Sequence, residues 1–193
     1  MREVAVPMPT WLRSVLVAAA VGAAAGLVVG GAGGRLVMRL VALAQPPDAL
    51  GTRMPSGAAV GDVTWAGTAQ VLGWGALVGV IGGLLYLGVR AVLPAGARVR
   101  APVFAGFLLL VPGAVFSADP AFARLERPLL ALALFAPVFV LFGLAVPVAV
   151  ERLAPGPAAG RGGLARTARG FLVLTVAVAV TVQVVSLSQV AAR

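Results

Sequence analysis

The sequence predicts an all-α protein, a polytopic bundle of transmembrane helices, and three observations support this fold class. Of its 193 residues, 61% are hydrophobic and 11% are charged, whereas a soluble domain carries about 25% charged residues. Its mean hydropathy is +1.05. The apolar residues also occur in continuous runs about as long as a membrane-spanning helix, without the polar–apolar alternation of membrane β-strands.

Five apolar runs predict five spans in a single integral membrane domain, residues 1–193. The spans are expected at about 12–34, 67–89, 101–117, 128–150 and 170–190. A proline- and glycine-rich segment at 45–66 follows the first span, and an arginine-rich segment at 151–169 follows the fourth. Both compositions favour loops.

The first two spans carry glycines at every fourth position, which places them on one face of each helix. The stripe of the first span consists of Gly22, Gly26, Gly30 and Gly34. The stripe of the second span consists of Gly75, Gly79 and Gly83. Small residues let membrane helices approach closely, so we expect a glycine zipper between these spans within one chain. Homo-oligomerisation through the same stripes is the alternative.

Each later span has one feature of its own. The second should begin after an N-cap at Asp62 or Thr64. The third run is the shortest and contains Pro112. Pro137 favours a kink in the fourth.

The fifth span carries polar residues at helical spacing, on a face that includes Thr175, Gln183 and Ser186. Such side chains hydrogen-bond between membrane helices. We interpret this face as a packing surface, with a hydrophilic substrate path as the alternative.

The arginines predict the topology. All fifteen basic residues are arginine, and five spans place nine on the side of the amino terminus and six on the other. If the third run did not cross the membrane, the two sides would hold eight and seven arginines. Cytoplasmic loops carry the excess of positive charge. We therefore expect a cytoplasmic amino terminus, an extracytoplasmic loop at 45–66, a cytoplasmic basic loop at 151–169 and an extracytoplasmic carboxyl terminus.

Arg35 and Arg39 are the leading candidates for a site. They share a helix face directly after the glycine stripe, and a charge at the membrane centre costs ~2.5–3.5 kcal/mol. We expect them to form a polar cluster with Asp62, or with Asp48, from the loop at 45–66. The alternative is that both contact lipid phosphate at the outer headgroups.

Composition argues against most chemistry. The chain has no cysteine or histidine and only six acidic residues, so the usual ligands of zinc, copper and haem iron and the usual catalytic base are missing. We predict no catalytic residues, no metal site and no cofactor. The formal net charge of +9 arises between apolar runs, where membrane topology and anionic headgroups explain it. Membrane lipids are therefore the expected partners, not nucleic acid.

The segments Gly33–Arg39 and Gly61–Thr64 resemble those of small, uncharacterised multi-pass membrane proteins from GC-rich, actinobacterial-type Gram-positive bacteria. The resemblance covers residues 20–90. It implies a bacterial plasma membrane location and no activity. Two functions fit the sequence: a non-enzymatic scaffold or subunit of a membrane complex, with a second copy or another membrane protein as partner, and a small-molecule or ion transporter or channel component.

Overall fold

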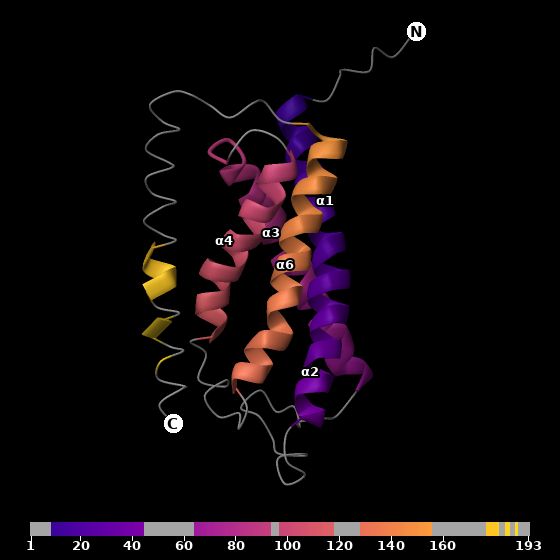
Figure 1. Cartoon of the computed structure of the whole chain (residues 1–193). Coiled ribbons are helices and arrows are strands. Elements are labelled where there is room, and N and C mark those ends of the chain that lie inside the picture. The colour runs from indigo at the N-terminus through magenta and orange to yellow at the C-terminus, as the bar shows by residue number, and fades with distance from the viewer. Residues whose placement is uncertain are drawn as a thin grey trace.

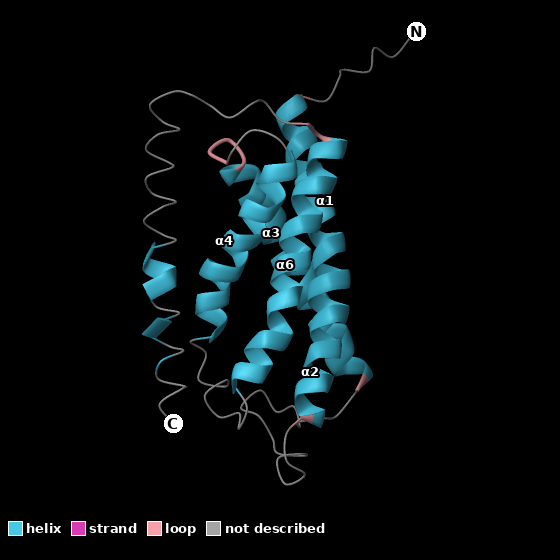
Figure 2. Ribbon diagram, in the orientation of Figure 1, coloured by secondary structure: helices cyan, strands magenta, loops and turns pink. Residues whose placement is uncertain are grey.

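The computed structural model describes residues 9–44, 64–93, 97–117 and 128–155, together with 177–181, 184–185 and 188. Its helices are α1 (Thr10–Ala25), the π-helix η1 (Gly26–Gly33), α2 (Gly34–Leu43), α3 (Trp65–Val89), α4 (Ala97–Ser117) and α6 (Pro128–Leu153). Within these segments all regular structure is helical and there is no strand (Figure 2). The predicted all-α class is confirmed.

The helices form an elongated bundle (Figure 1). α1, η1 and α2 follow one another without a break as a single helix of 34 residues, Thr10–Leu43. α3 packs against α1 and η1, and α4 packs against α6. α6 also contacts α1, η1 and α2, so it joins the two helix pairs.

Three helical segments are long and apolar enough to cross a membrane: Thr10–Leu43, Trp65–Val89 and Leu129–Leu153. Large apolar side chains also remain on the outside of the bundle, among them Trp74 on α3, 59% exposed, and Leu141 on α6, 56% exposed. An outer surface of this kind is stable in hydrocarbon and unfavourable in water. These features support a membrane-embedded helical protein.

The observed helices are longer than the predicted spans. The first helix continues past residue 34 to Leu43, because Gly33 and Gly34 have helical backbone angles, with φ of −62° and −58°. Its last part buries Val37 and Val41 against Ala131 of α6. These contacts stabilise the extension.

The other helix ends also differ from the expected ones. α4 begins at Ala97, so it includes residues expected in the preceding loop. α6 ends at Leu153, so the first three residues of the segment 151–169 are helical. α3 begins as predicted, because the Thr64 hydroxyl accepts a hydrogen bond from the Gly67 amide at 3.1 Å and caps the helix.

Several predictions lie outside the described residues. These include most of the loop at 45–66 and residues 156–169. The run at 170–190 is described only at 177–181, 184–185 and 188, where the chain is helical. Asp48, Asp62, Thr175, Gln183 and Ser186 also fall outside the described residues.

Candidate functional site

The closest helix contact in the described chain involves glycines of the first helix and of α3. A Cβ atom placed on Gly22 would overlap the carbonyl oxygen of Gly79, and one on Gly26 would overlap the carbonyl oxygen of Gly75. On α3, a Cβ atom at Gly83 would overlap the carbonyl oxygen of Ala18. The two backbones therefore touch directly, and only glycine fits. We call Gly22, Gly26, Gly75, Gly79 and Gly83 the glycine seam.

Beyond Gly26 the contact follows a different spacing from the predicted one. A Cβ atom on Gly31 would lie 2.9 Å from the Cα of Leu72, whereas one on Gly30 would lie 3.8 Å from the Cα of Gly75, an ordinary contact. At Gly34 a Cβ atom would meet nothing within 4 Å. The cause is η1, since a π-helix bonds residue i to i+5 and takes more residues per turn than an α-helix. The residue that faces α3 after Gly26 is therefore Gly31, five positions on.

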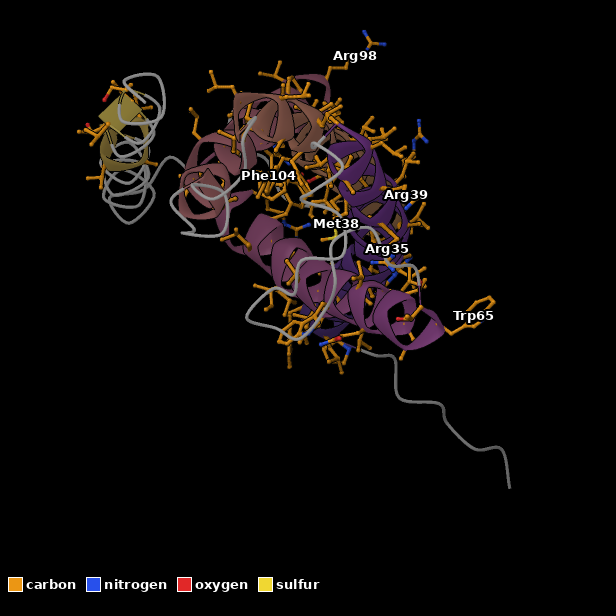
Figure 3. All side chains as sticks on the ribbon, turned by 90° about the horizontal axis from the view of Figure 1, so that it is seen from below. Arg35, Met38, Arg39, Trp65, Arg98 and Phe104 are labelled. Carbon is orange, nitrogen blue, oxygen red and sulfur yellow. The ribbon has the colours of Figure 1, made fainter. Side chains whose placement is uncertain are left out.

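Arg35 and Arg39 lie on α2, at one end of the bundle (Figure 1), and Figure 3 shows them from that end. Arg35 is half-buried, and its Nη2 lies 3.8 Å from the position of a Cβ atom on Gly67, in the first turn of α3. Arg39 is exposed. Both arginines have at least one further polar, ring or electrostatic interaction. Because Asp62 and Asp48 lie outside the described residues, the cluster of these four residues stays a prediction.

The opposite end of the bundle contains a buried polar group that sequence reasoning did not identify. The Tyr86 hydroxyl donates a hydrogen bond to Oε1 of Glu151 at 2.8 Å, and Nη1 of Arg100 donates to the same oxygen at 2.9 Å. The side chains of Arg100 and Glu151 are only 4% and 12% exposed. Phe104 covers Tyr86 edge-on, with ring centroids 5.1 Å apart. The ion pair joins α4 to α6, and the Tyr86 hydroxyl joins α3 to the same carboxylate inside the protein.

Two more arginines bind the end of α6. Nη2 of Arg13 donates to the carbonyl oxygen of Leu153, and Nη1 of Arg90 donates to that of Ala154, each at 3.2 Å. The last carbonyl groups of a helix have no partner within the helix and carry partial negative charge. Cations from α1 and α3 therefore stabilise this helix end. We call Arg13, Tyr86, Arg90, Arg100 and Glu151 the arginine cluster.

The arginine cluster unites helix ends that the predicted topology places on one side of the membrane. It joins the start of α1, the end of α3, the start of α4 and the end of α6. The arginine count predicts that Arg13, Arg90 and Arg100 lie on that side. The signal for Glu151 was its position directly after an apolar run. Tyr86 is the single tyrosine of the chain. It lies within an apolar span, and nothing in the sequence around it indicates a buried polar contact.

The hydrogen bonds of the arginine cluster stabilise its buried charges. One oxygen of Glu151 accepts hydrogen bonds from both a cation and a hydroxyl, which is the way a buried charge is stabilised. Within the described segments, no three His, Cys, Asp or Glu residues lie together as metal ligands would. Beside the arginine cluster, an apolar groove of about 250 Å³ lies between the end of α3 and α4, and Phe104 lines it.

Comparison of the chain with protein-family models, with curated proteins and with solved structures finds no match.

Proposed function

We propose that the protein is a multi-pass protein of the bacterial plasma membrane that acts as a non-enzymatic scaffold or subunit of a membrane complex. The observation that carries this proposal is the position of the charged residues. Among the described helices, the stretches 14–34, 65–89, 101–117 and 128–150 contain none. A transporter usually presents polar or ionisable groups near the middle of the membrane.

The helix contacts support the same proposal. The glycine seam brings two backbones into direct contact, and on the other pair a Cβ atom on Gly143 of α6 would overlap the Cα of Ala105 of α4. Interiors packed this closely leave no space for a substrate path between the paired helices. Such a bundle presents a fixed apolar outer surface, which suits lateral association with another membrane protein or with a second copy.

The proposed topology has five spans, with the amino terminus in the cytoplasm and the carboxyl terminus outside. It is supported by the charge at the two ends of the bundle: among the residues that the structure describes, Arg13, Arg90, Arg98, Arg100 and Arg152 belong to one end, and Arg35 and Arg39 to the other. The end with more arginines is assigned to the cytoplasm. A reporter that is active only in the cytoplasm, fused to the carboxyl terminus, should be inactive. Activity there would contradict five spans.

Two measurements test the scaffold function. Chemical cross-linking in intact cells should link the protein into an assembly larger than the 19.3 kDa chain. The same assembly should be recovered when the membranes are solubilised in mild detergent. The purified protein in liposomes should conduct no ions and exchange no small solutes. A chain that stays monomeric in cells, or a flux that depends on the protein, would refute the proposal and favour a transporter.

A further inference from the structure

Each end of the bundle presents an exposed tryptophan. Trp11, in the first turn of α1, is 66% exposed, and Trp65, the first residue of α3, is 91% exposed. Trp65 points outward from the bundle (Figure 3). In membrane proteins, tryptophan is enriched at the two membrane–water interfaces, where its ring lies at the depth of the headgroups. The two rings therefore fit the two surfaces of a bilayer.

Contacts between the helices show which arginines share the level of each ring. Near Trp11, Arg13 and Arg90 donate hydrogen bonds to neighbouring carbonyl groups at the end of α6. Near Trp65, Nη2 of Arg35 lies 3.8 Å from the position of a Cβ atom in the first turn of α3. Each tryptophan therefore lies about 3 Å along the helix axis from a position that an arginine occupies or approaches.

The distance between the two levels matches the thickness of a bilayer. The stretch 14–34 of the first helix has no charged residue and covers about 31 Å at 1.5 Å per residue. The hydrocarbon core of a bilayer is about 30 Å thick. On α3, Trp65 and Arg90 lie about 37 Å apart along the axis, which is less than the 40–45 Å or so of a bilayer with its headgroups. Both lengths place the arginines among the headgroups and the residues between them in hydrocarbon.

Arg39 lies one turn beyond Arg35, farther from the middle of the first helix, and is exposed. Val37 and Val41 hold this part of the helix against α6, so its position relative to the bundle is fixed. The guanidinium of Arg39 therefore lies on the water side of Trp65, at the depth where lipid phosphates occur.

We propose that Trp11 and Trp65 fix the depth of the bundle in the bilayer, and that Arg35 and Arg39 bind lipid phosphate in the headgroup layer at the α2 end. Guanidinium groups and phosphate oxygens form strong, charge-assisted hydrogen bonds. Arg35 and Arg39 then serve as a contact with lipid and not as part of a substrate path. The proposal rests on the membrane location of the protein, and it does not depend on the scaffold function, the number of spans or the orientation.

Trp74 provides an internal control for the depth of the rings. The chain has three tryptophans, and Trp74 is 59% exposed on the same helix as Trp65. It lies about 13 Å farther along α3 than Trp65, close to the middle of the hydrocarbon core. Three variants of the full chain, each with two of the substitutions Trp11→Phe, Trp65→Phe and Trp74→Phe, leave one ring at a time.

The first experiment measures fluorescence quenching of these variants in phosphatidylglycerol–phosphatidylcholine liposomes. The lipids carry bromine, which quenches tryptophan on contact, either near the headgroup or near the end of the acyl chain. Bromine near the headgroup should cause the greater loss of fluorescence for Trp11 and for Trp65. Bromine near the chain end should cause the greater loss for Trp74. The reverse order for Trp11 or Trp65 would overturn the assigned depth.

The second experiment tests the phosphate contact by solid-state NMR, with 13C in the guanidinium carbon of every arginine and 31P in the lipids of the same liposomes. The difference between the wild type and the double variant Arg35→Gln with Arg39→Gln isolates the signal of these two arginines. Phosphorus should dephase that signal. The double variant Arg100→Met with Glu151→Leu is the control, because Arg100 is buried in its ion pair and its difference signal should not be dephased.

A signal of Arg35 and Arg39 that phosphorus does not dephase would overturn the phosphate contact and favour the acidic partners predicted from the loop at 45–66. Flotation of the liposomes on a density gradient separates this outcome from a failure of the membrane location. A chain that floats with the liposomes is in the membrane, whereas a chain that stays behind would refute the membrane location and this proposal with it.

Discussion

The glycine seam and the arginine cluster both involve α1 and α3, but they hold helices together by opposite means. In the glycine seam, α1 and α3 approach because side chains are missing, and backbone atoms make the contacts. In the arginine cluster, four helix ends approach because long polar side chains reach between them. The glycine seam depends on shape and the arginine cluster on charge. Variants of the two regions should therefore differ both in the size of their effect and in what restores stability.

The largest effect is expected for Glu151→Ala. This change leaves the buried guanidinium of Arg100 without its carboxylate, and breaking a buried ion pair costs about 3–5 kcal/mol. The free energy of unfolding, measured by titration with a denaturing detergent, should fall by that amount. Replacing both partners, as in Arg100→Met with Glu151→Leu, should recover most of the loss, because the buried guanidinium is then removed together with its carboxylate. A double variant as unstable as Glu151→Ala would show that the pair is not the cause.

Gly79→Ala should have the next largest effect. Its Cβ would overlap the carbonyl oxygen of Gly22 and lie 2.7 Å from the Cα of Gly26, so the two helices must separate. Overpacking of this kind costs about 1–3 kcal/mol. Thermal unfolding in detergent should show a lower midpoint for Gly79→Ala, whereas Gly88→Ala, at an open position of the same helix, should match the wild type or exceed it. Equal midpoints for the two variants would argue against backbone contact in the glycine seam.

The smallest effect is expected for Arg13→Gln. Arg13 is exposed, and it binds one carbonyl group at the end of α6, where a cation contributes less than about 1 kcal/mol. The loss should shrink further at high salt, because exposed charges are screened. Unfolding measured at two salt concentrations separates this behaviour from that of Glu151→Ala, whose buried pair is screened much less. A large effect of Arg13→Gln that does not depend on salt would place Arg13 among the buried contacts.

The two regions also differ in how far the sequence predicts them. The facing glycines follow from local periodicity, because a four-residue spacing places Gly22 and Gly26 on one helix face. That periodicity fails at Gly31, since the π-helix changes the number of residues per turn. The four-residue spacing also does not predict the close contact of Gly143 with α4, because no other glycine lies four residues away from it.

The contacts of the arginine cluster are not local. Tyr86 and Arg100 lie 65 and 51 positions from Glu151 in the sequence, and no periodic pattern connects residues so far apart. The arginine count predicted the shared side of the membrane but not the buried carboxylate that organises it. For Arg35 and Arg39 the structure gives their position on α2 and the approach of Arg35 to α3. Their predicted acidic partners lie outside the described residues.

η1 has a consequence for how the first helix tolerates changes in length. A π-helix contains more residues than an α-helix of the same number of turns, so deleting one residue within Gly26–Gly33 would leave a continuous helix with ordinary α-helical turns. Because the number of turns stays nearly the same, the residues after the deletion would keep nearly their present orientation around the helix axis. A deletion at Leu36, in the ordinary α-helix α2, would instead rotate everything after it by about 100°, and Val37 and Val41 would turn away from Ala131. η1 thus sets the rotation of the residues around the helix axis, so that one unbroken helix presents its glycines to α3 and its valines to α6.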